Sequence, residues 1–350
     1  MPDRPRSVFA LVLLVLLVLL ALTAGAGAAA QTSRSAPPVA PVVLPRDHGA
    51  HSGSGIEWWY SAGLVHDAAG HRYSYFATIW RAGAGGLAHV NLIDLASNKT
   101  VLSSDDASAA AVIGSGPFSI SVGRMSYRWA ASPGRFGRFV VHADTTEGAI
   151  DLTLAPRRAY VLHGQRGVIQ QGRGGPSAYY SATRLAVSVR RRVGNATTTL
   201  TGEGWFDHQW GDFAANPEAL HWDWFACRLA DGRDLMLYRF LDMANRPLPQ
   251  AYTGTLVSRT GTVTHLSSFD VTERAPFVST PALGATYPLG WRLRVPRAGL
   301  DLTLKTLATH QFISITGAGT IWEGAARTVR GASGLCYVEN SRNIAGGRPR

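Results

Sequence analysis

Apolar and polar residues alternate along most of the chain after residue 55, in short runs. The clearest examples are residues 73–80 (YSYFATIW), 150–154 (IDLTL) and 300–304 (LDLTL). A period of two places successive side chains on opposite faces of a strand, which is typical of a half-buried β-sheet. Turn-forming residues separate the runs, and no long window has the 3.6-residue apolar period of a helix. The pattern therefore predicts an all-β protein of antiparallel strands.

The number of strands indicates more than one domain. The segment after residue 45 has room for about fifteen to twenty short strands, which is too many for a single barrel. We expect an N-terminal domain at 46–225 and a C-terminal domain at 226–345. Residues 216–225 (NPEALHWDWF) are ambiguous, and we expect a short helical turn that gives way to a strand.

The first 30 residues have the pattern of a secretory signal peptide. Arg4 and Arg6 precede an apolar run at 8–22, and small residues lead to a cleavage signal that ends at Ala30. The apolar run is shorter than the ~20 residues of a spanning helix. Residues 31–45 are Pro-rich and predict an extended tether. We therefore expect export to the periplasm or outside the cell.

Composition excludes several classes of protein. Charged residues make up 16% of the 350 residues and hydrophobic residues 46%, so the chain is not a disordered polyampholyte. The net charge of +11 comes almost wholly from arginine, and without interleaved aromatic residues or a recognised fold it gives little support to nucleic-acid binding. Two cysteines, Cys227 and Cys336, exclude a disulfide-rich scaffold, and whether they pair stays open.

A small group of potential metal ligands lies near the start of the mature chain. Asp47, His48 and His51 are close in sequence, but no third ligand follows at a useful spacing. We interpret the segment as a solvated loop and expect no metal. The usual nucleophile, phosphate and dinucleotide motifs are absent as well, so we expect no cofactor.

Tryptophan is concentrated in one part of the chain. Four of the ten tryptophans lie between residues 205 and 224, around Asp207, His208 and Asp223. Carboxyl groups beside apolar rings have raised pKa values, because burial disfavours the charged form. A carboxyl group that stays protonated at neutral pH can act as a general acid. These three residues are the catalytic candidates, and the alternative is that the indoles fill a barrel while Asp207 caps a turn.

Further aromatic clusters supply candidates for substrate binding. They lie at 57–60 (EWWY), 179–184 (YYSATR) and within 205–224, and carboxylates also follow or precede aromatic residues at 322–324 and 337–340. Arg184 either neutralises a buried carboxylate or lies on the surface. The binding candidates are Glu57, Trp58, Trp59, Tyr60, Tyr179, Tyr180, Arg184, Trp205, Trp210, Trp222 and Trp224.

These motifs, in this order, resemble the AttH-like and carotenoid 1,2-hydratase family, also described as predicted secreted hydrolases. The resemblance runs from about Leu44 to Asn340 and implies two lipocalin-like antiparallel β-barrel domains packed together. Residues 207–210 match the family's Asp-His-x-Trp motif, and residues 222–224 match its Trp-Asp-Trp motif. The chain departs from the family at 340–342 (NSR) and at Cys336.

The resemblance implies acid–base chemistry on a hydrophobic, isoprenoid or lipid-derived small molecule. Protonation of an alkene gives a carbocation, which needs a desolvated acid, aromatic faces and a group that orients water. Either Asp207 or Asp223 would be the acid, with His208 positioning or accepting a proton. We expect a hydratase or a hydrolase, and the alternative is a non-catalytic lipocalin-like carrier of an apolar ligand. Association with a membrane surface and the oligomeric state stay open.

Overall fold

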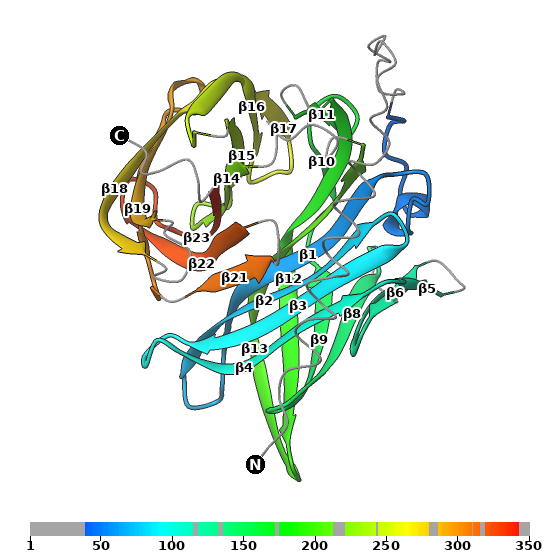
Figure 1. The fold of residues 1–350 in the computed structure, drawn as a ribbon. Coiled ribbons are helices and arrows are strands. Elements are labelled where there is room, and N and C mark those ends of the chain that lie inside the picture. Colours follow the sequence, from blue (N-terminus) through cyan, green and yellow to red (C-terminus); the bar gives the residue numbers. More distant parts are fainter. Residues whose placement is uncertain are drawn as a thin grey trace.

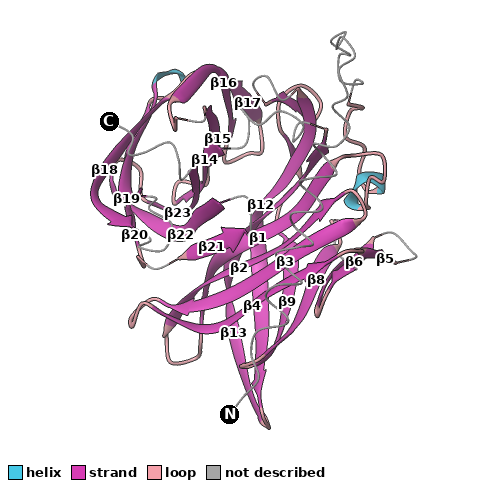
Figure 2. Cartoon of the chain, in the orientation of Figure 1, coloured by secondary structure: helices cyan, strands magenta, loops and turns pink. Residues whose placement is uncertain are grey.

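The computed structural model describes residues 39–114, 118–131, 136–171, 175–212, 221–242, 244–279, 286–309, 311–315 and 319–342. Within these ranges the regular secondary structure is almost entirely strand, apart from two 3-10 helices, η1 (Arg46–His48) and η5 (Pro296–Ala298) (Figure 2). The expected leader at 1–30 and the expected helical turn at 216–220 lie outside the described residues. Among those described, no helix is long and apolar enough to cross a membrane.

The first sheet contains thirteen antiparallel strands and curls into a half-barrel (Figure 1). Its path runs β4-β3-β2-β1-β13-β12-β9-β8-β7-β6-β5, and β10 and β11 both pair with β12. The strands are β1 (Ile56–His66), β2 (Arg72–Ala82), β3 (Gly85–Asp94), β4 (Lys99–Ser108), β5 (Val112–Ile113), β6 (Ser119–Val122), β7 (Met125–Ala130), β8 (Arg138–Thr145), β9 (Gly148–Pro156), β10 (Val161–Leu162), β11 (Val168–Gln170), β12 (Pro176–Val193) and β13 (Ala196–Gly211).

The second sheet contains ten strands in the order β17-β16-β15-β14-β23-β22-β20-β19-β18, with β21 paired to β22. The strands are β14 (His221–Leu229), β15 (Asp234–Leu241), β16 (Pro247–Val257), β17 (Val263–Leu266), β18 (Asp270–Ser279), β19 (Thr286–Val295), β20 (Leu300–Thr306), β21 (Phe312–Ile315), β22 (Gly319–Arg330) and β23 (Gly334–Arg342). The chain changes sheet between Gly211 and His221, whereas the sequence placed the domain boundary after residue 225, inside β14.

The predicted all-β fold of two packed lipocalin-like antiparallel domains is confirmed, and each domain is a curled half-barrel sheet. Each half-barrel encloses its own apolar core, and a third apolar cluster lies where the outer faces of the two sheets meet. The central strands of the first sheet contribute to both sides because they are buried on both faces. On β13, for example, Phe206 belongs to the first core and Trp205 to the cluster between the sheets.

The two cysteines form a disulfide inside the second sheet. Cys227 on β14 and Cys336 on β23 lie directly opposite each other, and the bond links positions 109 residues apart in sequence. The pairing that the sequence left open is therefore present in the structure, and it joins the first strand of the second sheet to the last.

Candidate active site between the two sheets

Strand alternation brings aromatic and acidic side chains of both sheets together at the junction. Hydrogen bonds cross it: the Tyr60 hydroxyl donates to Glu323 Oε2 at 3.1 Å, and Trp224 Nε1 donates to the Tyr179 hydroxyl at 3.0 Å. The Tyr60 ring also lies edge-on to Trp224, with ring centroids 5.3 Å apart. The junction is therefore a buried, specific contact between the sheets.

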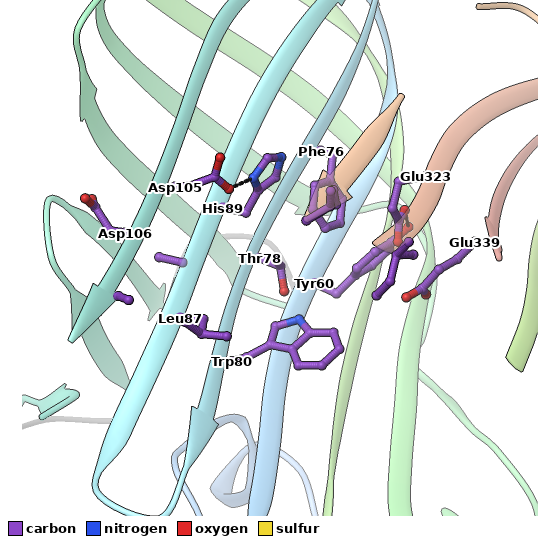
Figure 3. Close-up of a pocket in the computed structure, with 14 residues that line it drawn as sticks. Tyr60, Phe76, Thr78, Trp80, Leu87, His89, Asp105, Asp106, Glu323 and Glu339 are labelled. Atoms are coloured by element: carbon purple, nitrogen blue, oxygen red, sulfur yellow. Dashed lines mark hydrogen bonds and ion pairs between the residues drawn. The ribbon is translucent and has the colours of Figure 1, made fainter. Parts of the chain in front are cut away.

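A pocket with a volume of about 270 Å³ lies at this junction (Figure 3). The volume is slightly below the ~300–1,000 Å³ typical of small-molecule sites. The side chain of Asp105, which is 70% exposed, belongs to the solvent side of the pocket. Apolar and aromatic side chains form most of the wall: Tyr60, Phe76, Trp80, Leu87, Ile313 and Ile321.

Two carboxyl groups form one side of the pocket. Glu323 on β22 and Glu339 on β23 are direct cross-strand partners. Burial is the main reason that the pKa of Glu339 rises to about 8, and burial followed by the neighbouring Glu339 charge raises the pKa of Glu323 well above its usual range. Two carboxylates this close share protons rather than ionise together. The pair therefore holds at least one proton at neutral pH, facing an apolar pocket.

A histidine–aspartate pair lies across the pocket from the two glutamates (Figure 3). His89 on β3 is only 7% exposed, and its Nδ1 is in a very short contact with an Asp105 carboxylate oxygen. The other ring nitrogen lies 3.1 Å from the Asn91 side-chain amide nitrogen. This imidazole is held in a fixed orientation at the end of the pocket that Asp105 lines.

Asp207 lies next to the pocket, in a smaller adjoining cavity of about 20 Å³. Trp205 Nε1 donates to Asp207 Oδ1 at 2.7 Å, and the Tyr179 hydroxyl donates to Oδ2 at 2.8 Å. The Ser181 hydroxyl donates to Oδ1 as well. Burial raises the pKa of Asp207 to about 7, although these three hydrogen bonds oppose the shift. The adjoining cavity shares Glu339 with the main pocket.

His208 points to the opposite face of β13 from Asp207, into the first half-barrel. Its Nε2 lies 2.9 Å from Glu57 Oε1, and its ring stacks on Trp59. Burial lowers the pKa of His208 to about 4, against the raising effect of Glu57. Consecutive residues of a strand face opposite sides. His208 is therefore close to Asp207 in sequence but does not line the pocket.

Asp223 lies inside the second half-barrel. Arg239 Nη2 and Arg342 Nη1 each approach its carboxylate at 2.6 Å. Asn340 Nδ2 donates to Oδ1, also at 2.6 Å. Burial alone would raise the pKa of Asp223, but the two guanidinium groups outweigh it and hold the pKa below its usual range. The Asp223 carboxylate is therefore paired with two guanidinium groups, and two of its three contacts come from the 340–342 segment in which the sequence departs from the family.

The predicted binding residues divide by strand face. Tyr60 lines the main pocket, and the smaller cavity includes Trp58, Tyr179, Trp222 and Trp224, with Trp205 bonded to Asp207. The first half-barrel encloses Glu57, Trp59, Tyr180 and Trp210. Arg184 donates to the buried Asp234 at 2.9 Å and so links the two sheets away from the pocket.

The structure also changes the interpretation of the loop before β1. Asp47 is 4% exposed and His48 is 1% exposed, so the interpretation as a solvated loop is wrong for these two residues. His51 packs flat against Trp210, with ring centroids 3.8 Å apart. The segment 46–51 is part of the first half-barrel.

The pocket residues that were not chosen from the sequence include His89, Asp105, Glu323 and Glu339. Carboxylates beside aromatic residues at 322–324 and 337–340 gave a weak signal for the two glutamates. Nothing near His89 or Asp105 gave one, because cross-strand pairing between β3 and β4 brings them together.

The fold and the site together define a class: two curled antiparallel sheets with an acid-lined apolar pocket at their junction. A family model for AttH-like proteins matches residues 35–340, so the chain belongs to the AttH-like family. No curated protein matches the chain.

Solved structures share this fold. A proposed AttH protein from Nitrosomonas europaea is similar, with a TM-score of 0.76 and 22% identity over 87% of this chain and 98% of the other. Kievitone hydratase from Nectria haematococca has a TM-score of 0.69 and 17% identity over 88% of this chain and 96% of the other. At these identities the likeness establishes the fold.

Proposed function

We propose that the protein is an exported enzyme that adds water to a hydrophobic, isoprenoid or lipid-derived substrate by acid–base chemistry. The observation that carries this proposal is the pair Glu323 and Glu339, which keeps a proton at neutral pH beside an apolar pocket. A protonated carboxyl group in an apolar site can act as a general acid.

The reaction needs only one exchange of protons with the acid pair. The π electrons of the substrate double bond take the proton from the carboxyl group, which leaves a carboxylate and a carbocation. A water oxygen then forms the C–O bond with the cation, and the proton it loses returns to the carboxylate. The sum is the addition of one water molecule, and the acid is regenerated.

The walls of the pocket suit the charged intermediate. Aromatic faces attract a cation through the negative face of their π system, and Tyr60, Phe76 and Trp80 line the pocket. Water would enter from the end at which His89 is held by Asp105. A volume of about 270 Å³ accepts one end of a long apolar chain rather than the whole of it.

The comparisons support the same class of reaction. The fold is shared with a kievitone hydratase, and the sequence motifs around Asp207 and Asp223 resemble those of carotenoid 1,2-hydratases. We propose hydration as the main activity. In a hydrolysis the same acid would protonate the leaving group of a cleavable bond instead of a carbon–carbon double bond.

Export is part of the proposal. The N-terminal 30 residues have the pattern of a signal peptide that is cleaved near Ala30. The Cys227–Cys336 disulfide suits an oxidising compartment. Intact mass measurement of the secreted protein would give the cleavage position directly.

The test incubates the protein with a panel of acyclic isoprenoids and unsaturated lipids in H₂¹⁸O. Mass spectrometry detects a product heavier by one labelled water molecule, or two cleavage products for hydrolysis. We expect the product with the wild type and its loss with Glu339→Gln, whereas Glu147→Gln, at an exposed turn, is the matched control. Retained binding of these compounds with no change in mass would favour the lipocalin-like carrier instead.

A further inference from the structure

Three potential metal ligands meet inside the first half-barrel, away from the pocket. They are His51 from the segment before β1, Glu57 from β1 and His208 from β13, and their ligand atoms all lie within 4.8 Å of one another. Glu57 Oε1 is 2.7 Å from His51 Nδ1 and 2.9 Å from His208 Nε2. Glu57 and His208 are fully buried, and the His51 side chain is 24% exposed.

Each of the two histidines has an acceptor oxygen beside both of its ring nitrogens. His208 Nδ1 lies 3.1 Å from the backbone carbonyl of Asp47, and His51 Nε2 lies 3.6 Å from the Asp47 carboxylate. In the metal-free protein, His51 Nδ1 and His208 Nε2 can donate hydrogen bonds to Glu57 Oε1, because a carboxylate oxygen only accepts. A divalent ion between these three atoms would take the place of the two protons, and the outer ring nitrogens would then carry the protons that face Asp47.

We propose that His51, Glu57 and His208 bind a divalent transition metal ion, with zinc as the best match. Two imidazoles and one carboxylate form a ligand set that zinc uses in proteins. The inference is independent of the proposed hydration, because none of the three residues lines the pocket.

The outer contacts are those of a metal site. Metal-binding histidines commonly donate the N–H of their second ring nitrogen to a carboxylate or a backbone carbonyl. Asp47 supplies both kinds of acceptor: its backbone carbonyl lies beside His208 Nδ1, and its carboxylate faces His51 Nε2. Glu57 Oε2 accepts from Arg81 Nη2 at 3.0 Å and from the His51 backbone N–H at 2.9 Å, which fixes the carboxylate with Oε1 toward the two imidazoles. Arg81 also donates to the His51 carbonyl, at 2.5 Å, and so holds the loop in place.

The ion would have a structural role. It would tie the segment before β1 to the β1–β13 pair at the end of the half-barrel, where Trp59 and Trp210 cover the histidine rings. Sequence spacing could not identify the site, because Glu57 and His208 come from two strands and are 151 residues apart.

The experiment uses the full chain, purified without an affinity tag and treated with a chelator. Zinc is added back and the unbound ion is removed by gel filtration, and bound zinc is measured by mass spectrometry alongside the melting temperature. Cobalt(II) absorption gives an independent readout of nitrogen and oxygen ligands. We expect one zinc ion per chain, a Kd below about 1 μM and a higher melting temperature.

His51→Gln is the test variant, because its side chain is partly exposed and glutamine can still hydrogen-bond to Glu57. We expect its zinc affinity to fall at least about tenfold while the circular dichroism spectrum is unchanged. His71→Gln is the matched control, since His71 is 69% exposed and also pairs with a carboxylate, Asp67, at 2.9 Å. Wild-type protein that retains no zinc, or His51→Gln that binds it as tightly as wild type, would overturn the proposal.

Discussion

Replacing Glu339 by glutamine tests the acid pair most directly, because the change keeps the side-chain shape and removes the proton. General acid catalysis contributes roughly 10²–10⁴-fold to a rate. We expect kcat for hydration to fall by about this factor, with little change in KM because the apolar walls that bind substrate are intact. The product of the labelled-water assay is the measurement.

The raised pKa sets the pH dependence. With a pKa of about 8 instead of the usual 4.5, a carboxyl group is about 90% protonated at pH 7 rather than about 0.3%. Catalysis by the protonated form is therefore present below pH 8 and is lost as the pH rises through 8. A kcat/KM that is flat from pH 6 to 10 would refute the assignment.

The proton held by Glu339 lowers the stability of the wild type at neutral pH, so Glu339→Gln should lose activity and gain stability. Above pH 4.5 the unfolded chain loses this proton while the folded chain keeps it, so the free energy of unfolding decreases until about pH 8. At pH 7 the cost is at most about 3 kcal/mol, shared with Glu323 through their common proton. Glu339→Gln should therefore be inactive yet more stable than wild type in urea unfolding at pH 7. If the variant were less stable than wild type, the Glu339 carboxyl group would stabilise the fold at pH 7, and the cost inferred from its raised pKa would be refuted.

Three further predictions concern other buried groups. Asp223→Asn leaves Arg239 and Arg342 with Glu273 as their shared carboxylate partner and should lower the free energy of unfolding by at most about 3–5 kcal/mol. If the folded variant instead lost activity at unchanged stability, Asp223 would belong to the chemistry. Asp207→Asn places an amide N–H where a carboxylate oxygen accepts from Tyr179, Ser181 or Trp205. The free energy of unfolding should fall by about 1–3 kcal/mol, measured by urea unfolding with Glu147→Gln as the control. Replacing Cys227 and Cys336 together by serine removes the cross-link that closes a long loop, and the free energy of unfolding should fall by about 2–5 kcal/mol. Equal melting temperatures of variant and wild type would contradict this.

Much of the fold follows from alternation, and the alternation also explains where the sequence misled. Runs such as 150–154 predict strands because only one of their faces is buried in a core. The aromatic clusters give no such contrast, since their strands are buried on both faces. Asp207 lies beside the pocket, whereas His208 and Asp223 do not. His208 faces the other side of β13 from Asp207, and Asp223 lies in the other sheet, which the chain enters between Gly211 and His221. Local composition predicts neither the face of a strand nor the change of sheet.

The acid pair was harder to predict for a different reason. Glu323 and Glu339 lie on adjacent strands, and their raised pKa values come from cross-strand pairing and from burial against the other sheet. Neither cause is local in sequence. His89 and Asp105 likewise meet only through the β3–β4 register.

Strand β13 explains why candidate residues of two different kinds are crowded into one short motif. Its odd-numbered residues 205, 207 and 209 face the junction and the cavity beside the acid pair, whereas 206, 208 and 210 face the first half-barrel and the proposed metal site. A shift of register by one residue would exchange these two sets completely. Both environments therefore constrain the same strand, and a polar residue on either face is held only by partners specific to that face. The density of the motif reflects a strand buried on both sides, and not a single catalytic cluster.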